Sequence, residues 1–280
     1  MAAILALFSS LLWGSADYMG GNLSKRFKPL AVTGASQTIG LATGIFLILV
    51  SHGWRAPTLT WHGYLLPGIC AGFLGFFGLT AFYAGLSTGR MGVISPISSL
   101  SALIPLGVAV FNGERPKGLQ LIGMAIALAG AFCSSGPEIA GEVSLKPLLL
   151  GLCAAFGFGT ALTFMAMGSK TSALMTMTTM RVFTVAIVSL LALRYRTIGG
   201  FGAKDIRWLV AIGISDYLAN FLLGLATTKG LVSVAMVLGS LFPIVTSVLA
   251  FRFLHERLHK VQYLGIFLAI FGVALISVAS

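Results

Sequence analysis

The two halves of this chain repeat one another, and this repeat constrains the fold more than any single motif does. A shift of about 142 residues places Glu114-Arg115 on Glu256-Arg257. The same shift superimposes a glutamine and three small residues, in the pairs Gln120 and Gln262, Gly123 and Gly265, Ala127 and Ala269, and Gly130 and Gly272. Both halves are almost wholly apolar. Duplicated blocks of hydrophobic segments are typical of secondary transporters, whose two halves move around a central site.

The composition places the chain in a membrane. Hydrophobic residues make up 57% of the 280 residues, and charged residues only 9%. A soluble domain carries roughly 25% charged residues, because its surface faces water. We therefore interpret the chain as a multi-pass integral membrane protein, and we expect it in the cytoplasmic (inner) membrane.

Apolar runs of roughly 18 to 25 residues, long enough to cross a bilayer as helices, recur about ten times along the sequence. In the first half they are Ala2–Gly21, Leu30–Ser51, Tyr64–Leu86, Gly92–Phe111 and Gly118–Ser135. In the second half they are Pro147–Met167, Ala173–Leu193, Ile206–Thr227, Leu231–Leu254 and Val261–Ala279. The predicted fold class is an all-α membrane protein with two five-helix domains, residues 1–136 and 147–280. Most connections are very short, so any function must lie within the membrane.

The basic residues stand between the apolar runs and give the chain a net charge of +11. Such loops are attracted to anionic lipid headgroups, so we expect membrane lipid, and no nucleic acid, as a partner. With a cytoplasmic N-terminus, twelve of the 18 basic residues would lie on the far side of the membrane and five in cytoplasmic loops. The positive-inside rule therefore favours both termini outside.

Short segments of both halves resemble a known family. Residues 242–243 (FP), 253–258 (FLHERL) and 262–265 (QYLG) are similar to the second half of EamA-type proteins, which belong to the drug/metabolite transporter superfamily. Residues 12–15 (LWGS) resemble the opening span of that family. Arg181 lies near the position where the family often has an arginine early in the seventh span. The resemblance covers nearly the whole chain.

This resemblance implies ten transmembrane helices in two inverted five-helix repeats around a central cavity. Spans one, three, four, six, eight and nine would line the cavity, and the protein would export or exchange a small metabolite. The resemblance also implies cytoplasmic termini, against the charge count. We adopt the family's topology, because an inverted duplication places similar loops on opposite sides of the membrane.

Two acidic residues within apolar runs are the sharpest candidates for a binding site. An ionised carboxylate in the bilayer interior costs on the order of 3 kcal/mol, so such a group is usually paired, hydrated or protonated. Asp17 lies one helical turn after Trp13, and Asp216 lies one turn before Asn220. Neither acid recurs in the other half, which favours a specific task in binding substrate or a proton. A structural hydrogen bond is the alternative for both, and a position near the membrane surface is a further alternative for Asp17.

Other candidates follow from the prolines and from neighbouring polar or aromatic residues. Pro96 and Pro243 stand inside the fourth and ninth spans, where each removes a backbone donor and is expected to kink its helix. Ser95 and Ser240 near these kinks are expected to offer polar contacts. Trp13 and Tyr83 are expected to form an aromatic wall for an organic solute. Ordinary packing is the alternative for each of these residues.

Arg181 is the third charge within an apolar run. It either extends to the membrane interface or pairs with an acid. We do not expect it to anchor a substrate, because the seventh span is predicted to be peripheral. A phosphate-bearing solute would require several basic residues directed into the cavity. We therefore expect a cationic, zwitterionic or neutral small molecule.

Residues 255–259 (HERLH) match the H-E-x-x-H pattern of zinc proteases. The equivalent stretch of the first half keeps Glu114-Arg115 but has no histidine, and no third zinc ligand is evident. We expect no metal, no cofactor and no enzymatic activity, and we keep an intramembrane zinc protease only as an unfavoured alternative.

The sequence as a whole predicts a secondary transporter of a small organic metabolite, an exporter or exchanger, working by alternating access with proton coupling. The alternatives within transport are an uncoupled facilitator and a lipid flippase. A homodimer is left open as the assembly.

Overall fold

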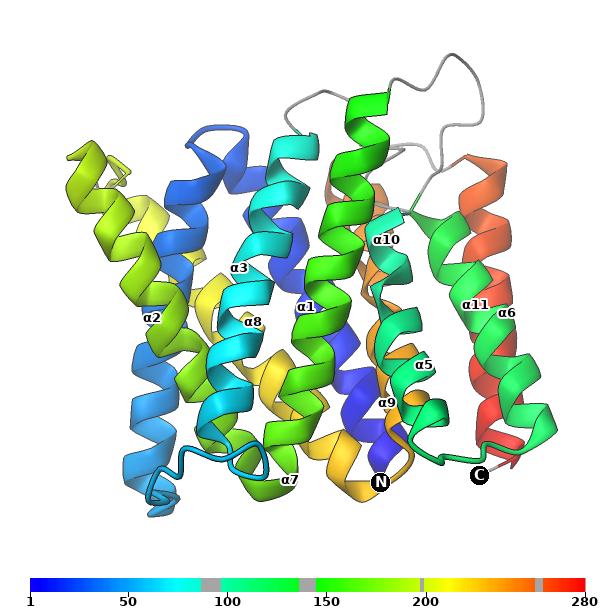
Figure 1. Ribbon diagram of the computed structural model, residues 1–280. Coiled ribbons are helices and arrows are strands. Elements are labelled where there is room, and N and C mark those ends of the chain that lie inside the picture. The colour runs from blue at the N-terminus through cyan, green and yellow to red at the C-terminus, as the bar shows by residue number, and fades with distance from the viewer. Residues whose placement is uncertain (87–96, 136–144, 197–198, 255–258, 280) are drawn as a thin grey trace.

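We describe the protein from a computed structural model, which covers all residues except 87–96, 136–144, 197–198, 255–258 and 280. The described part of the chain consists of helices and their connections (Figure 1). Seven of these helices are long and apolar enough to cross a membrane, and two shorter apolar helices, Ile97–Phe111 and Gly118–Ser134, accompany them. The predicted all-α membrane protein is confirmed at this level.

The helices follow the order of the predicted spans. The first half contains α1 (Ala2–Ser24), α2 (Pro29–Ser51), α3 (Leu65–Leu86), the 3-10 turn η1 (Leu100–Ala102), α5 (Leu103–Phe111) and α6 (Gly118–Ser134). The second half contains α7 (Leu145–Tyr195), α8 (Ala203–Lys229), α9 (Val232–Gly239), α10 (Phe242–Leu254) and α11 (Lys260–Ala279).

Two of the predicted spans correspond to a single interrupted element, α7. Its 51 residues run continuously except at Ser172, whose φ of −164° and ψ of 109° are extended. The hydroxyl of Ser172 accepts a hydrogen bond from the backbone N–H of Met175 at 3.2 Å, which caps the second part of the element. The break falls between the predicted spans Pro147–Met167 and Ala173–Leu193.

Conversely, the single predicted span Leu231–Leu254 corresponds to two short helices. α9 ends at Gly239 and α10 begins at Phe242, one residue before Pro243. The proline has no backbone N–H, so the helical hydrogen-bond pattern cannot run unbroken through this position. The chain therefore changes course in the middle of the ninth predicted span.

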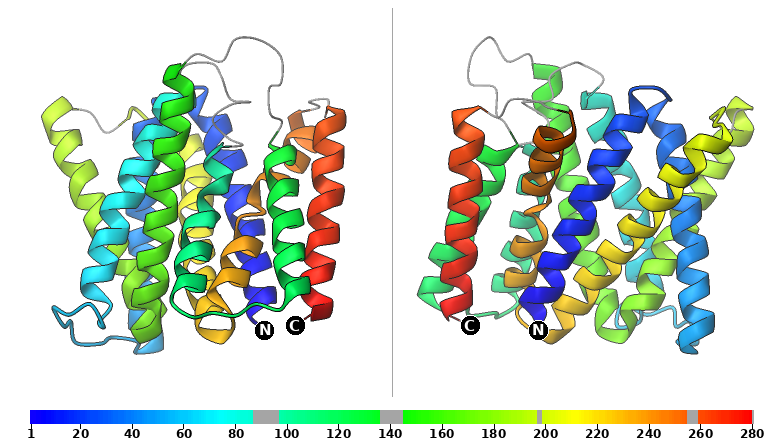
Figure 2. Two further views of the ribbon diagram at one scale, coloured as in Figure 1. Left: turned by 45° about the vertical axis from the view of Figure 1, so that its right-hand side comes forward. Right: turned by 180° about the vertical axis from the view of Figure 1, so that it is seen from behind.

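Both termini lie at the same end of the molecule (Figure 1), which we call the terminal side. α1 leaves that side at its N-terminus, and α11 returns to it at its C-terminus. α6 and α11 stand together at one edge of the bundle, whereas α2 and the second part of α7 lie at the other edge (Figure 2).

Four glycines bring α6 and α11 into backbone contact. A Cβ added at Gly123 would lie 2.9 Å from the carbonyl oxygen of Gly272, and one at Gly272 would lie 2.6 Å from that of Gly123. Gly130 and Gly265 face one another in the same way, at 2.7 and 2.8 Å. Small residues at such positions let helix backbones approach closely, because lipid supplies no hydrophobic force between helices. The order of the contacts shows that α6 and α11 run antiparallel.

Candidate substrate cavity

A cavity of about 400 Å³ opens within the bundle, in the half of the molecule that lies away from the terminal side. On α1 its lining begins at Trp13 and continues to Gly21, and on α2 it lies within the first two turns and a half, from Val32 to Gln37. α3, both parts of α7, α8 and α10 contribute further lining residues, as do Ser98, Ser101 of η1 and Ser135 at the end of α6. α2 and the second part of α7 thus contribute to a cavity that the family resemblance assigns to other spans.

Much of the wall is aromatic. Trp13 meets Phe242 edge-on, with ring centroids 6.0 Å apart, and both residues line the cavity. Phe76, Phe82 and Phe158 line it from α3 and α7. A wall of this kind suits the apolar part of an organic solute.

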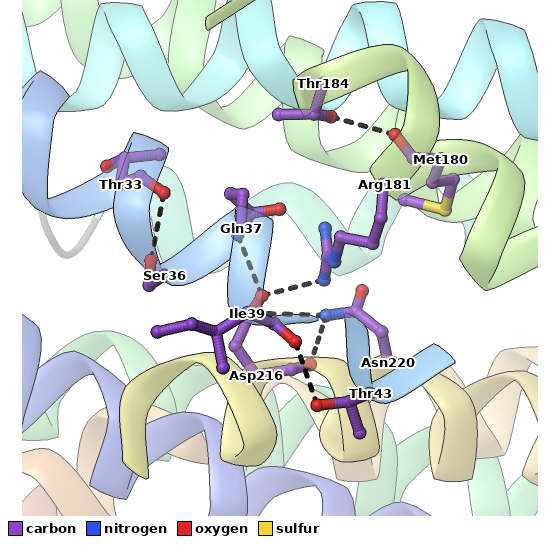
Figure 3. Close-up of polar contacts among 10 residues, drawn as sticks. All are labelled: Thr33, Ser36, Gln37, Ile39, Thr43, Met180, Arg181, Thr184, Asp216 and Asn220. Carbon is purple, nitrogen blue, oxygen red and sulfur yellow. Dashed lines mark hydrogen bonds and ion pairs between the residues drawn. The ribbon is translucent and has the colours of Figure 1, made fainter. Parts of the chain in front are cut away.

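A polar cluster around Asp216 forms one side of the cavity (Figure 3). Arg181 Nη2 lies 2.7 Å from Asp216 Oδ2, and Gln37 Nε2 donates to the same oxygen at 2.9 Å. Asn220 Nδ2 lies 3.3 Å from Asp216 Oδ1 and donates to the Asp216 backbone oxygen at 2.8 Å. The cluster joins α2, α7 and α8 through charge-assisted hydrogen bonds to one carboxylate.

The placement of Arg181 corrects one expectation. Its side chain is only 8% exposed and lines the cavity, so neither a peripheral position nor an extension to the membrane interface is right. The alternative that it pairs with an acid is confirmed. Because the guanidinium is bound to Asp216, it neutralises that carboxylate within the wall.

Asp17 lies in a different situation. It lines the cavity and is exposed, and it makes no hydrogen bond or ion pair with any described residue. Asp216 lines the same cavity. The cavity therefore contains one paired carboxylate and one that is free of protein partners in the described part of the chain.

The remaining sequence candidates fall into two groups. Pro243 lines the cavity next to Phe242, whereas Ser240 is buried outside the lining and donates to the Val237 carbonyl at 2.8 Å. The side chain of Tyr83, and the whole of Ser95 and Pro96, lie outside the described residues. Trp13, Asp17, Asp216 and Asn220 are brought together around one cavity, and Ser240 is not.

Sequence reasoning missed Gln37 and Thr33 of α2, which both line the cavity. Gln37 is 8% exposed and holds Asp216, and Thr33 is 3% exposed. A polar side chain inside an apolar span is a functional candidate by default. The position of the Gln37 amide in such a span could therefore have marked it as a candidate site residue.

A contact between the two halves lies on the terminal side of the molecule, and its residues do not line the cavity. Glu114, in the connection from α5 to α6, accepts hydrogen bonds from the backbone N–H of Val232 at 2.7 Å and from Ser233. These residues form the first turn of α9, whose orphan N–H groups a carboxylate satisfies well. The neighbouring Arg115 donates to the carbonyl of Val110 at the end of α5, at 3.1 Å. Glu114-Arg115 is thus a structural element in the first half.

The H-E-x-x-H stretch lies mostly outside the described residues. Among the residues that are described, no three histidine, cysteine, aspartate or glutamate side chains gather in a metal-binding group.

Comparison with known proteins identifies the family. The model of the EamA-like transporter family matches residues 1–136 and again residues 145–278. The chain belongs to the EamA-like transporter family. It is therefore a multi-pass integral membrane protein of a transporter family, as the sequence resemblance predicts. The two matches correspond to duplicated halves.

Of two related proteins, one matches this EamA protein over nearly the whole chain and the other over about half of it. The uncharacterized transporter YwfM of Bacillus subtilis is 23% identical over 99% of this chain and 94% of its own length. An uncharacterized protein of Methanocaldococcus jannaschii is 26% identical over 133 residues, which cover 48% of this chain and 97% of that protein. A solved crystal structure shares the fold, with a TM-score of 0.81 at 19% identity over 99% of this chain and 97% of that chain.

Proposed function

We propose that this EamA protein is a secondary transporter of a small organic metabolite that works by alternating access around the described cavity, with proton coupling and no enzymatic activity. The observation that carries the proposal is a cavity on one side of a duplicated bundle, with the free carboxylate of Asp17 in its wall. A site near the midplane between two repeats is where transporters of this kind bind their substrates.

The contacts of α6 and α11 support ten helices in two inverted five-helix repeats, residues 1–136 and 147–280. The repeat makes Gly123 equivalent to Gly265 and Gly130 equivalent to Gly272. Exchanging the halves converts the contact of Gly123 with Gly272 into the contact of Gly265 with Gly130. Because the two equivalent helices run antiparallel, the operation that relates them is a two-fold rotation, as an inverted repeat requires.

The contact on the terminal side supports alternating access, with that side closed in the described state. The cavity lies in one half of the molecule, while Glu114 ties α9 to the other repeat at the opposite end. A symmetric counterpart of this state would be open at the terminal side and closed at the far side. Under the family's topology, with cytoplasmic termini, the described state faces outward.

Asp17 and Asp216 are the proposed binding groups, with different tasks. Asp17 is free to take up the coupling proton or a positively charged part of the solute. Asp216, held by Arg181, Gln37 and Asn220, shapes the polar side of the site. Trp13 contributes the aromatic wall. We keep Tyr83, Ser95, Ser240 and the kink at Pro96 as weaker candidates.

An uncoupled facilitator and a lipid flippase are the alternatives that this geometry leaves open, and an intramembrane zinc protease is the third. The experiment that separates them is flux in proteoliposomes, with amines, amino acids, sugars and nucleosides, with and without an imposed pH gradient. We expect gradient-driven flux in the wild type and none in Asp17→Asn. Asp205→Asn, which replaces an acid outside the cavity, is the matched control and should keep its flux.

Gradient-independent flux would replace the proposal with a facilitator. Unchanged flux in both Asp17→Asn and Asp216→Asn would refute the assignment of the two acids. Lipid scrambling without solute flux would favour the flippase, and stoichiometric zinc in the purified protein would favour the protease.

A further inference from the structure

The charges and acceptors of the cavity wall indicate which class of solute fits. We infer that the cavity binds a protonated organic amine, an ammonium that still has N–H donors, through the carboxylate of Asp17. This inference deepens the proposed transport function and rests on it for its physiological meaning, but the binding itself can be tested alone.

The first step is the charge of the wall. Among the described lining residues, the ionisable groups are Asp17, Asp216 and Arg181. Arg181 and Asp216 neutralise one another at 2.7 Å, which leaves the negative charge of Asp17. A bound monocation cancels that charge. A zwitterion leaves the charge in place, and an anion adds to it.

The second step is the commitment of Arg181. A carboxylate or phosphate on a solute would need a cationic partner in the wall. The guanidinium of Arg181 is 8% exposed and is bound to Asp216 through Nη2, while its Nε is buried and has no hydrogen-bond partner. Taking it away for a solute would strand Asp216 without its counter-ion, which is costly in a low-dielectric site. The described wall therefore disfavours anionic groups.

The third step is the set of unused acceptors on α2. Gln37 donates its amide N–H to Asp216, and its oxygen points away from that residue (Figure 3) without a hydrogen-bond partner. The hydroxyl of Thr33, one helical turn earlier, also has no partner. Both residues line the cavity and are more than nine-tenths buried. A buried polar atom without a partner is destabilising, and an ammonium N–H satisfies such an acceptor after a small side-chain rotation.

The fourth step is the aromatic wall. Trp13 lies one turn before Asp17 on α1, and its ring packs against Phe242. A cation next to a tryptophan face is stabilised, and the apolar body of the solute is buried against the same rings. Carboxylate, amide oxygen, hydroxyl and aromatic rings together match an amine that carries an aryl or alkyl group.

The test uses solutes that share a phenylethyl group and differ in charge. Phenethylamine, N,N,N-trimethylphenethylammonium, phenylalanine and 3-phenylpropionate are titrated into the purified full-length protein. Binding is followed by calorimetry and by tryptophan fluorescence, for which Trp13 is the cavity reporter. We expect phenethylamine to bind the wild type about 10- to 100-fold more tightly than each of the other three. The trimethyl compound lacks N–H donors, and phenylalanine and 3-phenylpropionate carry a carboxylate for which the described wall has no uncommitted cationic partner.

Variants locate the binding group. Asp17→Asn should weaken phenethylamine binding by about 10- to 100-fold. Asp17→Glu should restore most of the loss, which shows that the carboxylate and not the fold is responsible. Asp205→Asn serves as the control outside the cavity and should bind like the wild type.

The inference is overturned by phenylalanine, 3-phenylpropionate or the trimethyl compound binding as tightly as phenethylamine. It is also overturned by amine binding that survives Asp17→Asn, or by no saturable amine binding to the wild type. The proposed function is tested separately. Amine binding without flux would contradict the proposed transport and leave this inference standing. Flux of an anionic or zwitterionic solute would support the proposed transport and contradict this inference.

Discussion

The carboxylate of Glu114 accepts two hydrogen bonds from Ser233, one from its backbone N–H at 3.1 Å and one from its hydroxyl at 2.7 Å. The two residues belong to different repeats of the EamA family. Their contact holds the start of α9 against the connection between α5 and α6, on the side that is closed in the proposed mechanism. The bond between the halves is made through the end of a helix, so a change at Glu114 alters the closure without touching the cavity.

Glu114→Ala is predicted to loosen the terminal side. Each hydrogen bond to a charged group contributes about 1.5–3 kcal/mol, or about 10- to 100-fold, and three such bonds are lost, so the opened population should rise by at least about 10- to 100-fold. A cysteine introduced at the buried position of Ala235 on α9 reports the opening, after Cys70, Cys133 and Cys153 are replaced by serine. The rate of maleimide labelling is the measurement.

A graded control accompanies this variant. Ser233→Ala removes only the hydroxyl donor and leaves both backbone N–H groups on Glu114, so it should raise the labelling rate less than Glu114→Ala does. Equal labelling in Glu114→Ala and in the protein with native Glu114 would show that the contact does not control the closure.

Arg181→Met is predicted to destabilise the protein, because it leaves the partly buried Asp216 without its counter-ion. Removing one partner of a buried pair costs about 3–5 kcal/mol, and the 22% exposure of Asp216 to the cavity puts the cost toward the lower end. The double variant Arg181→Met with Asp216→Leu should recover most of the loss, since no charge is left unpaired. The free energy of unfolding in mixed micelles checks both.

A double variant no more stable than Arg181→Met would contradict this account, and would assign the loss to packing of the arginine side chain instead.

Gly130→Ala is predicted to separate α6 from α11. The added Cβ would lie 2.7 Å from the Gly265 carbonyl oxygen and closer still to the backbone of Ala269, and helix backbones cannot yield locally to such a contact. We expect a loss of at least about 1–3 kcal/mol, the usual cost of overpacking. Thermal unfolding in detergent is the measurement.

Gly107→Ala is the matched control, because a Cβ at this helical glycine of α5 meets nothing within 4 Å. It should be neutral or stabilising by about 0.5–1 kcal/mol, as alanine is in a helix. Equal destabilisation by the two substitutions would mean that the α6–α11 contact has no special weight.

The order of the helices could be predicted from the sequence, and four of the predicted site residues line one cavity. Apolar runs define spans directly, so the break at Ser172 and the start of α10 beside Pro243 fall where composition and proline predict them. Helical spacing also placed Asp17 with Trp13, and Asp216 with Asn220, on shared faces. These inferences need only local geometry.

The partners of each charge could not be predicted in the same way. Arg181 pairs with Asp216, and Asp17 has no partner among the described residues; both outcomes depend on how α7 and α8 are rotated and shifted against one another. An apolar sequence does not indicate how two helices are rotated and shifted against one another, because any face of an apolar helix can contact either lipid or a neighbouring helix. Gln37 was not predicted for a different reason. A neutral amide stands out less in an apolar sequence than a charge does, although Gln37 holds the same carboxylate.

The reciprocal glycine contacts of α6 and α11 have a mechanical consequence. Under the proposed alternating access, two halves related by a two-fold axis exchange conformations, and points on that axis are the ones that stay still. The contacts of Gly123 with Gly272 and of Gly130 with Gly265 map onto one another under that exchange, so they lie around the axis. This helix pair can keep its geometry in both states and serve as the fulcrum about which the rest of the bundle tilts.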